Sequence, residues 1–162
     1  MTAPIQDTSI RAQIVVDVPN EHAFAVFTES SSWKPPEQNL LEADIAESLF
    51  EAREGGYIYD RGVDGSECRW ARVLIYEPPR RVLFAWLITP RWSVASDVSS
   101  ASEVEVRFIA EGPERTRVEI EHRHLERHGE GWEGLRDAVG APDGWPLYLQ
   151  RLAEQLAARA SD

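Results

Sequence analysis

The chain has 162 residues, 43% of them hydrophobic and 28% charged, which is typical of one globular domain that buries a full core. Its formal net charge of −11 argues against a nucleic-acid surface, because neutralising phosphates requires clustered Lys and Arg. The single cysteine, Cys68, cannot form an internal disulfide, and no apolar run approaches the ~20 residues that span a bilayer. The first residues lack the pattern of a secretory signal, so we expect a cytoplasmic protein without integral membrane association.

The N-terminal third begins with a strand and a short helix. We expect residues 1–9 to form a flexible N-terminus. Apolar residues at every second position from Ile10 to Val18 predict a half-buried strand. Residues 21–28 then carry an apolar face that favours a short helix, and residues 30–37 form a loop that contains Trp33.

The middle of the chain consists of short strands separated by turn signals. The strands are expected at 43–52, 57–61, 69–76, 82–88, 103–110 and 116–125. The segment 82–88 is apolar on both faces, which indicates a central strand. Residues 93–102 are small and polar, and we expect a flexible loop between two strands.

The end of the chain predicts one long amphipathic helix from about residue 144 to about residue 159. Asp143 is a suitable N-cap, and Leu149, Leu152 and Leu156 fall on one face. Together the elements give an α+β protein in which this helix covers the apolar face of an antiparallel sheet. A strongly curved sheet wrapped around one helix leaves a space that is either packed with side chains or kept as a cavity.

Five segments, in their order and spacing, resemble the START-like (SRPBCC, or Bet v 1-like) superfamily. They are VVDVPNEHAFAVFTE, EGGYIYDRG, ARVLIYEPPRRVLFAWLI, RTRVEIEHRHL and DGWPLYLQRLAEQL. Within the superfamily, the chain is similar to the group related to the C-terminal domain of the heat-shock-protein-90 ATPase activator (Aha-type). The resemblance implies one helix-grip domain over residues 1–162. In this fold a curved antiparallel sheet of six or seven strands holds the C-terminal helix, with a cavity between them. Members include lipid and hormone binders, cyclases, oxygenase domains and co-chaperone-like proteins, so the fold leaves the function open.

Three of the four histidines lie within the stretch EHRHLERH, which raises the question of a metal site. On a strand over 116–125, His122 and His124 share a face with Val118 and Ile120, so both should point inward near the cavity rim. His128 lies beyond the strand and cannot be placed. A metal would need a third ligand from another element, and the neighbouring glutamates alternate outward. We therefore expect no metal, and interpret His122 and His124 as ligand contacts or as hydrogen-bonded core histidines.

Aromatic residues are the other candidates for the cavity wall, although each is also an ordinary core residue on its own. Arg72 is ambiguous. If the Trp70 face of its strand points inward, Arg72 is a buried cation that needs a carboxylate or an anionic ligand; if not, it is solvated. The aromatic candidates are Tyr57, Tyr59, Trp70, Phe84, Trp86, Trp132, Trp145 and Tyr148.

No nucleophile elbow, phosphate-binding loop or dinucleotide fingerprint is present, and we expect no cofactor. We interpret the chain as a protein that binds an apolar or aromatic small molecule, oriented by His122, His124, Trp145, Tyr148 and Arg72. One alternative is an enzyme, such as a cyclase or hydrolase, that uses a cavity histidine as acid or base. Another is a protein-interaction module of the chaperone-activator type. A homodimer and a chaperone partner both stay open.

Overall fold

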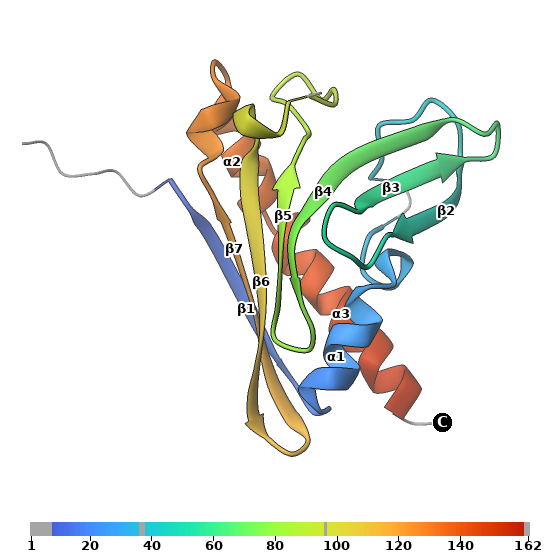
Figure 1. The fold of residues 1–162 in the computed structure, drawn as a ribbon, viewed down its shortest axis with the longest axis vertical. Coiled ribbons are helices and arrows are strands. Elements are labelled where there is room, and N and C mark those ends of the chain that lie inside the picture. Colours follow the sequence, from blue (N-terminus) through green and yellow to red (C-terminus); the bar gives the residue numbers. More distant parts are fainter. Residues whose placement is uncertain (1–7, 36–37, 96, 161–162) are drawn as a thin grey trace, which may run out of the picture.

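The computed structural model describes residues 8–35, 38–95 and 97–160, which form one antiparallel sheet and the helices that cover it (Figure 1). The seven strands lie in the order β1-β7-β6-β5-β4-β3-β2. Their bounds are β1 Ile10–Val16, β2 Ile45–Phe50, β3 Tyr57–Gly62, β4 Glu67–Glu77, β5 Arg81–Trp86, β6 Ser102–Gly112 and β7 Arg115–Arg123. The helices are α1 Asn20–Phe27, α2 Trp132–Gly140 and α3 Trp145–Ala160, with short 3-10 turns at η1 Ser30–Ser32, η2 Val98–Ser100 and η3 Leu125–His128.

The predicted α+β helix-grip architecture is confirmed. The long helix α3 runs along one face of the curled sheet and passes beside α1 (Figure 1). Leu149, Leu152 and Leu156 are buried in the core, as their shared face predicted. Fully burying a leucine side chain contributes roughly 1.5–3 kcal/mol. Since α3 presents a row of them, most of its attachment to the sheet is apolar packing. No helix in the described ranges is long and apolar enough to cross a membrane.

The outer face of the sheet carries a ladder of ion pairs. Glu105 accepts from both Arg81 and Arg107, each at 2.7 Å. Arg123 pairs with Glu121 at 3.1 Å on the next strand. Glutamates and arginines are thus paired on neighbouring strands, and the face opposite the helix is charged.

Several element boundaries differ from the sequence prediction. The strand expected over 116–125 ends at Arg123, because His124 adopts a left-handed backbone conformation with φ of 63°. Helix α2 was not predicted at all. The expected flexible loop at 93–102 contains η2, and its last residue, Ser102, begins β6; Ser96 lies outside the described residues. Residues 1–7 of the expected flexible N-terminus also lie outside them.

Candidate functional site

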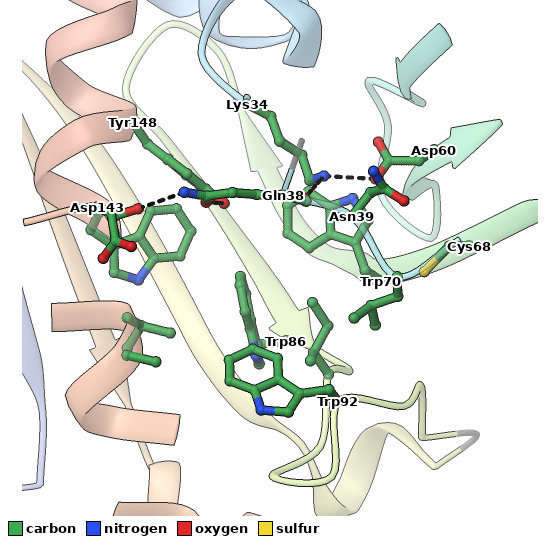
Figure 2. Close-up of a pocket in the computed structure, with 16 residues that line it drawn as sticks. Lys34, Gln38, Asn39, Asp60, Cys68, Trp70, Trp86, Trp92, Asp143 and Tyr148 are labelled. Carbon is green, nitrogen blue, oxygen red and sulfur yellow. Dashed lines mark hydrogen bonds and ion pairs between the residues drawn. The ribbon is translucent and has the colours of Figure 1, made fainter. Parts of the chain in front are cut away.

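A cavity of about 630 Å³ lies between the sheet, the end of α2, the first turn of α3 and the segment that follows η1 (Figure 2). Aromatic side chains dominate its wall. Trp70 comes from β4, Trp86 from β5, Trp92 from the loop after β5, and Trp145 and Tyr148 from the first turn of α3. The volume falls in the range of small-molecule sites, and the wall is mostly apolar with a few polar groups.

The indole rings form a continuous surface. The ring centroids of Trp70 and Trp86 are 5.4 Å apart, and those of Trp86 and Trp145 are 5.5 Å apart, both edge to face. Tyr148 continues the series at 5.3 Å from Trp145. Phe84 lies beneath this wall, 6.0 Å from Trp70. Edge-to-face pairs add about 0.5–1.5 kcal/mol each beyond area burial, so these ring contacts stabilise the wall.

Gly144 explains how Trp145 comes to face the cavity. The chain turns sharply between α2 and α3, and a Cβ at position 144 would collide with the carbonyl of Val139. Only glycine fits this close approach of two backbone segments. The turn delivers Trp145, which is 1% exposed, directly into the wall.

A chain of hydrogen bonds holds Trp145 from behind. The indole Nε1–H of Trp145 donates to Nδ1 of His122 at 3.1 Å. An indole N–H can only donate, so Nδ1 is the acceptor and the proton of His122 sits on Nε2. That Nε2 lies 2.8 Å from Oγ of Ser102, which lies 2.7 Å from Nε2 of His128. The donors therefore run in one direction: Trp145 to His122, His122 to Ser102, and Ser102 to His128.

The two histidines in this series of hydrogen bonds, His122 and His128, are neutral near pH 7. Burial, with a smaller contribution from the neighbouring His128, lowers the pKa of His122 from its ordinary value of 6.5 to about 3. Burial also lowers the pKa of His128. His122 is fully buried and does not line the cavity. Its role in the structure is to fix the orientation of Trp145.

One wall of the cavity holds a buried ion pair. Nζ of Lys34 lies 2.7 Å from Oδ2 of Asp60, and these side chains are only 5% and 1% exposed. Lys34 also donates to the carbonyl oxygen of Gln38 at 2.6 Å, and Ser48 donates to Oδ1 of Asp60 at 2.9 Å. Asp60 reaches the cavity because Ile58 and Asp60 alternate inward along β3. Figure 2 shows the pair beside Trp70, whose ring centroid is 5.8 Å from the ammonium.

Gln38 links this wall to helix α3. Its Oε1 accepts from the hydroxyl of Tyr148 at 2.7 Å, and its Nε2 donates to the carbonyl of Asp143 at 3.0 Å (Figure 2). The segment at residue 38 is thus tied to both sides of the cavity, to Lys34 on one side and to α3 on the other.

The predicted site residues divide into three groups. Trp70, Trp86, Trp145 and Tyr148 line the cavity together. Phe84 and His122 lie one layer behind it. Five others lie away from it: His124, Arg72, Tyr57, Tyr59 and Trp132.

The inward orientation expected for His124 is wrong. Its left-handed backbone breaks the alternation of β7, and its side chain is 42% exposed with Nδ1 3.9 Å from Glu126. Strand alternation applies only while the backbone stays extended, so the pattern cannot be carried past Arg123.

The side chain of Arg72 points outward, away from the cavity, although Trp70 on the same strand points inward. The register of β3 and β4 shifts between Ile58 and Tyr59, which marks a bulge in β4. Trp70 and Ala71 are therefore both buried, while Arg72 lies outside, its guanidinium carbon 5.3 Å from the ring centroid of Tyr57. Arg69 stacks on Tyr57 and Tyr59 in the same way, at 4.9 and 5.3 Å. The expectation that these two tyrosines line the cavity is wrong because Ile58 and Asp60 occupy the inward positions of β3, which leaves the tyrosines on its other face.

The polar part of the site was not predicted from the sequence. Lys34 had a visible signal, since it is the chain's only lysine and follows a buried tryptophan. Asp60 occupies an inward position of a strand whose other inward residue is apolar, which is also a signal. The other cavity residues that had not been singled out are Gln38, Asn39, Leu40, Cys68, Ile88, Trp92, Ala138, Val139, Asp143 and Gly144.

Two further features of the wall concern its chemistry. Cys68 is a free, buried thiol opposite Asp60, and burial raises its pKa, with the charge of Asp60 adding to the effect. The indole N–H groups of Trp70 and Trp86 are buried and have no acceptor in the described part of the chain. Within residues 8–35, 38–95 and 97–160, no cluster of His, Cys, Asp or Glu is arranged to hold a metal ion.

Comparison with known proteins now identifies the family. A family model described as "Activator of Hsp90 ATPase homolog 1-like protein" matches residues 17–157. The chain belongs to this family. The resemblance to the START-like superfamily and its Aha-type group is thereby confirmed, and the match covers every strand of the sheet except β1.

Solved structures of the same fold include two whose names state a role. An anthrahydroquino-gamma-pyrone synthase, Txn09, is 36% identical, with 94% of this chain and 99% of that chain covered and a TM-score of 0.65. A self-sacrificing resistance protein, CalC from Micromonospora echinospora, is 24% identical, with 94% and 96% covered and a TM-score of 0.68. Protein NE0264 from Nitrosomonas europaea is 17% identical, with 97% and 99% covered and a TM-score of 0.67. No curated protein is similar enough to the chain to count as a match.

Proposed function

We propose that this protein, acting as a single START-like domain in the cytoplasm, binds a planar aromatic small molecule in the cavity between the sheet and α3. One observation carries the proposal. Four tryptophans and Tyr148 converge on a cavity of about 630 Å³. Aromatic rings recognise other rings through stacked and edge-to-face contacts, and this volume accommodates a skeleton of three or four fused rings.

The comparison with Txn09 supports an aromatic ligand. That protein shares 36% of its residues with this chain and is described as an anthrahydroquino-gamma-pyrone synthase. Its name describes a fused-ring aromatic compound, the class of molecule that the indole wall of this cavity would accept.

The same comparison favours a second candidate, an enzyme that acts on the bound aromatic compound. A histidine is not suited to the acid–base role in this cavity, because His122 lies behind Trp145 and its pKa is lowered to about 3. The titratable side chains on the cavity surface are those of Lys34, Asp60, Cys68, Asp143 and Tyr148, and among them Lys34 and Asp60 form a hydrogen-bonded pair. Under this alternative, the Lys34–Asp60 pair would do the acid–base chemistry.

The outer face of the sheet does not support the chaperone-activator alternative. An interaction module would present a contiguous apolar patch, whereas the outer face of the central strands carries the Glu105 and Arg123 ion pairs. The exposed large apolar residues in the described ranges are Val15, Val63, Trp92 and Val94.

The binding proposal is tested by titrating the protein with pyrene and following tryptophan fluorescence. We expect saturable quenching, because the probe would contact the indole wall. In the variant Ala138→Phe the added ring would fill the cavity, since Ala138 lines it, and affinity should fall at least about tenfold. Ala158→Phe, on the exposed side of α3, is the matched control and should bind as the wild type does. Equal affinity in all three proteins would reject the cavity as the binding site.

A further inference from the structure

The Lys34–Asp60 pair is an unusual feature of an otherwise aromatic cavity. The sequence contains a single lysine among its arginines, and this lysine is buried in the cavity wall. Lysine differs from arginine in its compact ammonium, which carries three donors on a rotatable head. Burying an ion pair is costly unless the remaining donors and acceptors are also used, so the pair calls for an explanation beyond fold stability.

Counting donors and acceptors shows what the pair still offers. The ammonium of Lys34 has three N–H groups, and within the described residues two of them have acceptors: Oδ2 of Asp60 and the carbonyl of Gln38. The carboxylate of Asp60 has about four acceptor positions, and within the described ranges two are used, by Lys34 and by the hydroxyl of Ser48. One free donor and free acceptor positions therefore lie side by side on the cavity wall, because both residues line it.

A hydroxyl group matches this arrangement, since it accepts one hydrogen bond and donates another. We propose that Lys34 and Asp60 recognise an aromatic hydroxyl group of the ligand, with Lys34 donating to its oxygen and its O–H donating to Asp60. This inference rests on the proposed function and narrows it. The ligand is a phenol or hydroquinone of a fused-ring system, oriented with its hydroxyl at the Lys34 end and its rings against Trp70, Trp86 and Trp145.

Among the described residues of the cavity wall, no other charged side chain lies beside the Lys34–Asp60 pair. Cys68 faces Asp60 on the neighbouring strand, and its raised pKa keeps the thiol neutral near pH 7. Asp143, the other carboxylate on the cavity wall, lies at the α3 end, where its backbone carbonyl accepts from Gln38 (Figure 2). A site that hydrogen-bonds a hydroxyl discriminates strongly against an analogue that lacks it, because its own polar groups are then left unpaired.

Three probes with the same ring system test the inference: 1-hydroxypyrene, 1-methoxypyrene and pyrene. The hydroxyl both donates and accepts, the methoxy oxygen only accepts, and pyrene does neither. We expect the wild type to bind 1-hydroxypyrene at least about tenfold more tightly than pyrene, with 1-methoxypyrene weaker than 1-hydroxypyrene. Dissociation constants come from tryptophan quenching at about pH 7.

The variant Lys34→Met/Asp60→Asn removes both charges together, so neither is left buried and alone. The preference for 1-hydroxypyrene over pyrene should then fall to about one. Arg61→Met/Glu47→Gln removes an ion pair of 3.0 Å on the neighbouring strands that does not line the cavity, and should keep the wild-type preference.

The outcomes separate this inference from the proposed function. If none of the probes binds the wild type, the proposed function fails. If the wild type binds pyrene and 1-hydroxypyrene equally well, only the role of Lys34 and Asp60 is overturned. A preference that survives in a folded double variant overturns it too. Should the double variant not fold, the wild-type preference among the three probes still decides.

Discussion

The buried His122 makes a specific prediction about stability in acid. Its pKa is lowered from 6.5 to about 3 in the folded protein, chiefly by burial. Between these two values the unfolded chain binds a proton that the folded chain excludes. The contribution of His122 to stability is therefore complete above about pH 6.5 and is lost progressively as the pH falls toward 3.

The perturbation is His122→Gln, which keeps a hydrogen-bonding side chain but cannot titrate. One pH unit corresponds to about 1.36 kcal/mol. At about pH 5, roughly 1.5 pH units below the ordinary value of 6.5, the wild type should have lost about 2 kcal/mol through this residue. The total down to about pH 3 is bounded at roughly 5 kcal/mol.

The assay is urea unfolding of both proteins at about pH 7.5 and about pH 5, followed by tryptophan fluorescence. The carboxylates titrate in both proteins, so their effect cancels in the difference. We expect the wild type to be the more stable protein at pH 7.5, with the gap narrowing by about 2 kcal/mol at pH 5. Parallel pH profiles for the two proteins would refute the reasoning that His122 is neutral in the fold.

Three further substitutions test other parts of the account. Tyr148→Phe removes the hydrogen bond of 2.7 Å to Gln38. Pyrene should then dissociate a fewfold faster, as measured by stopped-flow fluorescence quenching. An unchanged dissociation rate would mean that this hydrogen bond does not restrain the ligand. His124→Ala should leave the affinity for pyrene within about twofold and stability within about 0.5 kcal/mol, because its side chain is exposed and outside the cavity; a large loss of affinity would restore His124 to the site. Leu152→Ala, on the buried face of α3, should lower the free energy of unfolding by about 2–5 kcal/mol in urea titrations, and a loss below about 1 kcal/mol would contradict its place in the core.

The sequence predicts the fold well because its elements are locally encoded. Strand alternation and turn residues mark all seven strands, and the spacing of Leu149, Leu152 and Leu156 marks α3. The aromatic part of the cavity follows from the same patterns, since Trp70, Trp86, Trp145 and Tyr148 lie on those elements.

The parts that could not be predicted depend on backbone irregularities and on long-range pairing. A bulge in β4 places Trp70 inside and Arg72 outside, although both fall on one face of a regular strand. His124 leaves the strand through a single left-handed residue. Lys34 and Asp60 lie 26 positions apart, one after a 3-10 turn and one on β3, and no local pattern brings them together.

The central claim is that the cavity between the sheet and α3 binds an aromatic molecule, and a crystal structure with 1-hydroxypyrene tests it most directly. We predict density for the fused rings against Trp70, Trp86 and Trp145, with the hydroxyl oxygen within hydrogen-bonding distance of Lys34 and Asp60. Density for the probe at another surface, or a cavity that stays filled with water at saturating probe, would contradict the account.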